Sequence, residues 1–161
     1  MTSNLLRETV TKPQNMKGWS FIMKMRVLYS TSKGKIKTIA QLITDKYATE
    51  KVNCMDSIPP AYSCDKERLV VMLVSTGKDP ANALILFCKE LTKARAANVA
   101  FIVDGPADGA KVLVNAVKEA GSNVIEDILY VKGGLPFLKG VKDEEAKQVT
   151  DWMDKVMANL Q

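Results

Sequence analysis

The residues best suited to chemistry stand where a short apolar run gives way to a helical pattern. A loop of this kind, polar and with one glycine, directs backbone N–H groups and the positive end of a helix dipole toward one point. An anion is the natural occupant, and a phosphate is the anion we expect. The alternative is a plain strand-to-helix turn whose serines cap the helix. The candidate contacts are Ser30, Thr31, Ser32, Lys33, Gly34, Lys35 and Ile36.

Other kinds of site are excluded by residues that the chain lacks. It has no histidine, which removes imidazole ligands, the Ser-His-Asp and Cys-His arrangements and the usual general base at neutral pH. Asp104 and Asp108 resemble a catalytic pair in spacing, but aspartates of a turn explain them better. We therefore predict no catalytic side chain and no metal site.

Composition and charge describe an ordinary globular chain. Its 161 residues suit one domain, with 47% apolar and 25% charged residues, and no apolar run is long enough for membrane insertion. The formal charge of +5 comes from lysines scattered along the chain, without the basic and aromatic clustering that marks nucleic-acid binding. Three cysteines without a CxxC pair favour a reducing compartment, and so a cytoplasmic location.

Hydrophobic periodicity predicts strands alternating with helices, which is the pattern of an α/β fold with a parallel sheet and helices on both faces. Because ligands of such folds bind beyond the carboxyl ends of the strands, loops 30–35, 75–80 and 104–109 should gather at one edge. Residues 1–24 read as an N-terminal extension, either a targeting signal or an appended segment, before a domain at 25–161. The predicted strands are 25–30, 51–55, 68–75, 98–104 and 123–131, and the predicted helices are 34–48, 80–94, 109–120 and one that begins near 143.

Three segments resemble flavodoxins and the FMN domains of diflavin reductases. Residues 29–36, with Ala40 after them, are similar to the flavodoxin phosphate loop Ser/Thr-x-Thr-Gly-x-Thr. STGKDPANALILFCKEL, from Ser75, resembles the loop and helix that follow the third strand of FMN domains. GSNVIEDILYV and DEEAKQVTDWMDKV resemble the end of short flavodoxins, with a tryptophan in the last helix. The resemblance covers about residues 25–160.

The resemblance implies a three-layer, doubly wound, five-stranded parallel sheet in the order 2-1-3-4-5. It also implies an FMN-binding flavoprotein that transfers electrons between redox partner proteins. The phosphate would lie in loop 30–36 and the flavin ring between the loops that follow the third and fourth strands. The residues that this places at the ring are Ser75, Thr76, Gly77, Lys78, Asp104 and Gly105.

The chain departs from the family pattern at both ends of the expected cofactor. Lys33 and Ile36 stand where the phosphate loop has threonines, although the lysine charges at 33 and 35 could substitute for the lost hydroxyls. The two ring loops are short and have no aromatic residue to stack on a flavin; Tyr62, in the loop 56–67, is the one aromatic residue that could reach over the ring. We therefore expect weak FMN binding. The alternatives are a cofactor-free binding or scaffold module and, in third place, an NAD(P)H-dependent flavin or quinone reductase.

Overall fold

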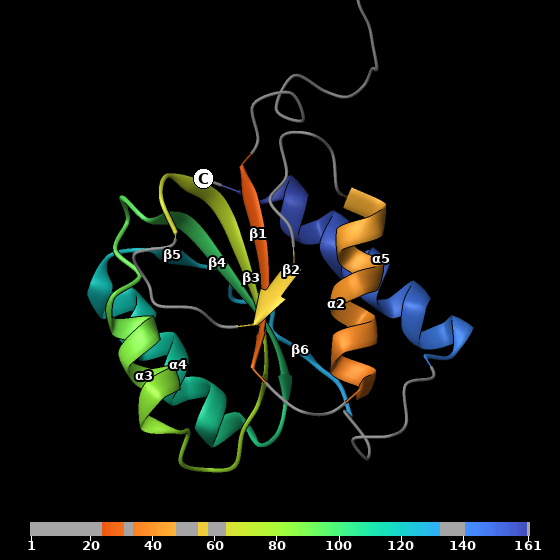
Figure 1. The fold of residues 1–161 in the computed structure, drawn as a ribbon, viewed down its shortest axis with the longest axis horizontal. Helices are drawn as coiled ribbons and strands as arrows, with labels where there is room; N and C mark the ends of the chain where they lie inside the picture. Colours follow the sequence, from red (N-terminus) through yellow and green to blue (C-terminus); the bar gives the residue numbers. More distant parts are fainter. Residues whose placement is uncertain (1–23, 31–33, 48–54, 58–63, 133–140, 161) are drawn as a thin grey trace, which may run out of the picture.

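The computed structural model describes residues 24–30, 34–47, 55–57, 64–132 and 141–160. In this part of the chain a parallel sheet stands between two helical layers (Figure 1). Helices α2 (Gly34–Tyr47) and α5 (Asp143–Ala158) cover one face, and α3 (Asn82–Lys89) and α4 (Ala107–Ala120) cover the other. The predicted three-layer α/β fold is confirmed.

The sheet has the order β2-β1-β3-β4-β5, with β6 also pairing with β4. Its strands are β1 (Met25–Ser30), β2 (Met55–Ser57), β3 (Glu67–Ser75), β4 (Ala96–Asp104), β5 (Asn123–Val124) and β6 (Leu129–Tyr130). All of these pairs are parallel, so the predicted order 2-1-3-4-5 is confirmed. Since each strand runs in the same direction, all the carboxyl ends meet at one edge.

The predicted strand 123–131 is broken in two. Val99 and Ile102 of β4, three residues apart, pair with Val124 and Leu129, five residues apart, so the outer strand carries two extra residues. The ladder resumes beyond the break, where the Val131 N–H donates to the carbonyl of Val103 at 2.9 Å. The prediction of one continuous strand was therefore wrong over 125–128, although both ends of the predicted segment pair with β4.

The observed bounds of three other elements also differ from the predicted ones. β2 lies at Met55–Ser57 rather than 51–55, where residues 51–54 are outside the described part. Helix α3 ends at Lys89 rather than Ala94, because the following residues form turns in which Arg95 and Ala96 donate to the carbonyl of Thr92. Helix α4 begins at Ala107, two residues early, because Pro106 already serves as its N-cap.

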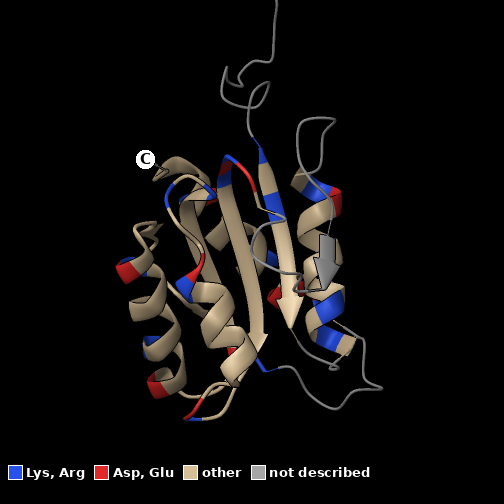
Figure 2. Ribbon diagram, turned by 60° about the vertical axis from the view of Figure 1, so that its left-hand side comes forward, with Lys and Arg blue, Asp and Glu red and all other residues tan. Residues whose placement is uncertain are grey.

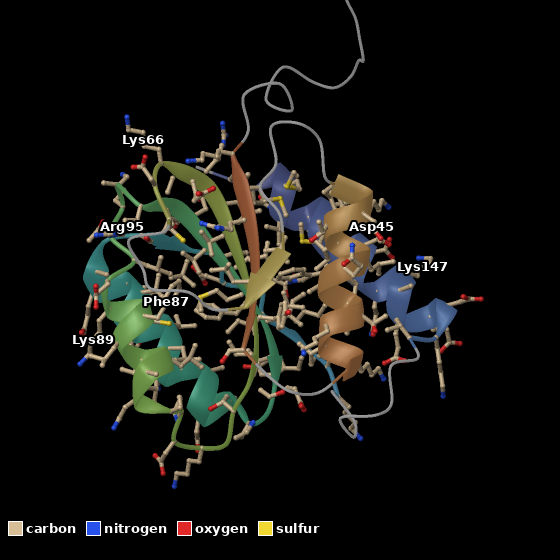
Figure 3. The ribbon with its side chains drawn as sticks, in the orientation of Figure 1. Asp45, Lys66, Phe87, Lys89, Arg95 and Lys147 are labelled. Atoms are coloured by element: carbon tan, nitrogen blue, oxygen red, sulfur yellow. The ribbon has the colours of Figure 1, made fainter. Side chains whose placement is uncertain are left out.

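Alternation along the central strands builds two separate cores. Val70, Met72 and Val74 of β3 pack with α3 and α4, and Leu69, Val71 and Leu73 pack with α2 and α5. All of these β3 side chains are fully buried, as expected for a parallel sheet covered on both faces. In Figure 3 Phe87 lies between α3 and the sheet, whereas Lys89 points away from it. No helix of the described residues is long and apolar enough to cross a membrane.

Candidate functional site

The carboxyl edge of the sheet brings together the ends of β1, β3 and β4. Ser30 pairs with Val74, and Ser75 pairs with Asp104, so the chain leaves all three strands at neighbouring points. This is the convergence that the sequence predicted for the three polar loops. Thr31, Ser32 and Lys33 lie outside the described residues, so their contribution to an anion site stays a prediction.

The first turn of α2 forms one wall of this edge. Gly34 begins the helix and is buried, and the N–H groups of a first turn have no partner within their own helix. The first turn of α2 contains no acidic residue of its own that would compensate the positive end of its dipole. This geometry suits an anion bound by backbone N–H groups.

Two residues that were predicted to contact the phosphate use their side chains for other interactions in the structure. The Ile36 side chain is fully buried in the core between α2, α5 and the sheet, so only its backbone is available to a ligand. Lys35 forms an ion pair with Glu145 in the first turn of α5. That pair, together with a hydrogen bond from the Lys142 N–H, holds the pKa of the Glu145 carboxyl below its usual value.

The two loops expected to edge a flavin ring are joined to each other. The Ser75 hydroxyl donates to Oδ2 of Asp104 at 3.0 Å, and the Thr76 N–H donates to the Asp104 carbonyl, also at 3.0 Å. The β3–β4 ladder thus continues one step past the strands. Asp104 therefore serves to tie the loops together, in keeping with a turn-forming role.

Glycines bring the two loops into backbone contact. A Cβ added at Gly105 would lie 2.0 Å from the Thr76 carbonyl oxygen, and one at Gly109 would lie 2.1 Å from the Gly77 carbonyl oxygen. Gly105 also has a φ of 152°, in the range that other residues rarely adopt. Gly77 and Lys78 are exposed on the outer side of this contact. Only Gly105 and Pro106 separate β4 from α4, so little chain is available to form a wall for a ring.

An FMN site in this fold would need room for the phosphate and for the ring. The corner at α2 offers N–H donors and fits a phosphate. The loops after β3 and β4 touch through Gly105 and Gly109, and the described residues of these loops include no aromatic side chain, so they do not fit a ring held between them. Tyr62 lies outside the described residues.

Two residues that lie near this edge were not identified from the sequence. Glu145 was predicted only as one of the acids that suit the start of the last helix, and no local signal links it to Lys35, since the two are far apart in the chain. Tyr130 ends β6 opposite Val103 and is 47% exposed. The sequence predicted that it lies in a strand and did not indicate this exposure.

Solved structures show which known fold this is. The crystal structure of oxidised Flavodoxin 2 from Bacillus cereus superposes with a TM-score of 0.64 at 14% identity, over 84% of this chain and 98% of that one. A short-chain flavodoxin associated with a non-canonical PDU bacterial microcompartment gives a TM-score of 0.62 at 12% identity, over 84% and 97%. The flavodiiron core of Flv1 from Synechocystis gives 0.58 at 17% identity, over 85% of this chain and 36% of that one.

No protein-family model and no curated protein matches the sequence. The solved structures are too distant in sequence to say more than the fold, but they agree with the strand order and with the helical layers described above. The protein has a flavodoxin-like fold, as its loops and last helix predicted.

Proposed function

We propose that this protein is a flavodoxin-like FMN-binding electron carrier that holds its cofactor weakly and without a covalent bond. The observation that carries the proposal is the meeting of the ends of β1, β3 and β4 beside the first turn of α2. In open α/β sheets this edge is where ligands bind, and an N-terminal turn favours phosphate. The buried thiol of Cys88 suits a reducing compartment such as the cytoplasm.

The chain's own groups act mainly at the phosphate. The hydroxyls of Thr31 and Ser32 and the N–H groups of the first turn of α2 would donate to its oxygens, while Lys33 adds an attractive charge. Bound FMN would supply the electron transfer, since no described side chain offers redox or acid–base chemistry at this edge. Because Gly105 and Gly109 bring these two loops into contact, a bound flavin would lack the stacking that contributes roughly 0.5–1.5 kcal/mol per aromatic pair.

Titration of the purified protein with FMN tests this proposal. We expect the flavin absorption to shift and its fluorescence to be quenched, with half-saturation in the micromolar range. Lys33→Ala should weaken binding, whereas Lys89→Ala, which removes the same charge from the exposed end of α3, should not. An unchanged flavin spectrum at high micromolar protein would contradict the proposal.

A second candidate, a cofactor-free module that binds a protein partner, is favoured by one observation. The backbone contacts at Gly105 and Gly109 close the loops that would hold a ring. This candidate predicts that proteins captured by the wild-type chain are captured equally by Lys33→Ala. Loss of those proteins in the variant, together with flavin quenching in the wild type, would decide for the electron carrier.

A further inference from the structure

The ion pair between Lys35 and Glu145 joins the first turns of two neighbouring helices. The side chains are 17% and 26% exposed, so the pair is partly shielded from water. One oxygen of the Glu145 carboxylate also accepts the Lys142 N–H at 3.2 Å, which fixes the carboxylate at the start of α5. The pair is therefore held in place by both helices.

Lys35 stands where a helix usually disfavours a cation. The first turn of α2 has no acid of its own, so the lysine charge adds to the positive end of the helix dipole. Glu145 supplies the missing negative charge from a different helix. The chain thus carries an internal carboxylate beside the turn that is the phosphate-binding wall in the proposed function.

We propose that Glu145 sets the phosphate affinity of this corner by engaging Lys35. While the carboxylate holds the lysine, the charge of the lysine is largely neutralised, and a phosphate arriving at the first turn of α2 experiences less attraction. Glu145 is a residue that tunes affinity and does not itself contact the ligand. The inference rests on the proposed function, because it concerns the same phosphate.

The decisive variant is Glu145→Gln, which removes the charge and keeps an oxygen that can accept the Lys142 N–H. A single, partly exposed ion pair changes affinity modestly, so we expect FMN and inorganic phosphate to bind to this variant about two- to five-fold more tightly than to the wild type. Glu144→Gln is the matched control, because it removes the same charge from an exposed neighbour in the same turn. It should leave affinity nearly unchanged.

A double-mutant cycle shows whether Glu145 acts through Lys35. Lys35→Gln alone should weaken phosphate binding, because it leaves the Glu145 carboxylate without its partner beside the first turn of α2. The double variant Lys35→Gln/Glu145→Gln should bind phosphate no more tightly than the wild type, and a double variant that keeps the full gain of Glu145→Gln would overturn the inference.

The outcomes separate this inference from the proposed function. FMN binding by the wild type, with Glu145→Gln no tighter than Glu144→Gln, keeps the proposed function and overturns the inference. Binding by Glu145→Gln when the wild type binds neither FMN nor phosphate supports the inference and contradicts the proposed function of the native chain. Absence of binding in both proteins overturns both.

Discussion

The indole N–H of Trp152 donates a hydrogen bond of 2.7 Å to the carbonyl oxygen of Asp127. Trp152 is on α5, and Asp127 lies in the break between β5 and β6, so the bond fastens the last helix to the irregular part of the sheet. The Trp152 side chain is buried against α2 and the sheet. One residue thus packs the core and satisfies a carbonyl that the interrupted ladder leaves without a strand partner.

Trp152→Phe should lower the free energy of unfolding by about 1–3 kcal/mol, because it keeps an aromatic ring but loses a partly buried hydrogen bond. Urea denaturation followed by far-ultraviolet circular dichroism measures the change. Met153→Leu, a substitution of similar volume at the next buried position, should cost less. Equal losses in the two variants would show that the hydrogen bond contributes little.

Gly109→Ala should destabilise the protein by about 1–3 kcal/mol, since its Cβ would meet the Gly77 carbonyl oxygen in a backbone contact that cannot relax cheaply. Helix propensity alone predicts the opposite effect on stability, because alanine is favoured over glycine within α4. Gly77→Ala is the matched control on the other side of the same contact. A Cβ there meets nothing within 4 Å, so its melting temperature should stay near that of the wild type.

Tyr47 should make stability depend on pH above about 10. Its hydroxyl donates to Oδ1 of Asp154 at 2.6 Å, and partial burial first, then this carboxylate, raise the tyrosine pKa above its ordinary value. The folded state therefore retains the proton longer than the unfolded chain, so this contribution is complete below the unfolded pKa and is lost as pH rises beyond it.

Urea denaturation at several pH values from 9 to about 11.5 checks this. Tyr47→Phe should be less stable than the wild type at pH 9 and should lose less stability as pH rises. Tyr130→Phe, at an exposed tyrosine on β6, serves as the control. Parallel pH profiles for wild type and Tyr47→Phe would contradict the prediction.

Cys88 should be inert in the folded protein. Burial raises the pKa of its thiol to about 12, so little of its thiolate forms at pH 8. In a variant that carries both Cys54→Ser and Cys64→Ser, Ellman's reagent should label almost no thiol in native buffer and one in denaturant. Rapid labelling of the native variant would show that this core opens readily.

The arrangement of the sheet was predictable because its signals are local and repeated. The unbroken apolar run of β3 predicted a strand covered on both faces, and every side chain from Leu69 to Val74 is fully buried. The stripe of Val149, Trp152 and Val156 likewise predicted the inner face of α5. Strand order followed from resemblance of the loops and could not have been read from periodicity alone.

The site was less predictable because its decisive contacts join distant residues. Nothing near Lys35 in sequence indicates that Glu145 engages it, and nothing near Gly109 indicates that its Cα lies against Gly77. Charged residues are dispersed over the helices and strand ends (Figure 2), so charge pattern gave no guide to the pairing. Gly105 was predicted to lie beside the flavin ring, whereas the structure uses it and Gly109 for the close approach of the two loops.

The packing of Gly105 and Gly109 limits how this protein could be engineered. Tighter flavin binding is usually sought by adding an aromatic side chain beside the ring, but neither position accepts even a methyl group. Between Asp104 and Ala107 the chain has two residues, and one of them is Gly105. A designer would therefore have to insert residues there, and the number inserted, more than their identity, would decide whether a ring can enter.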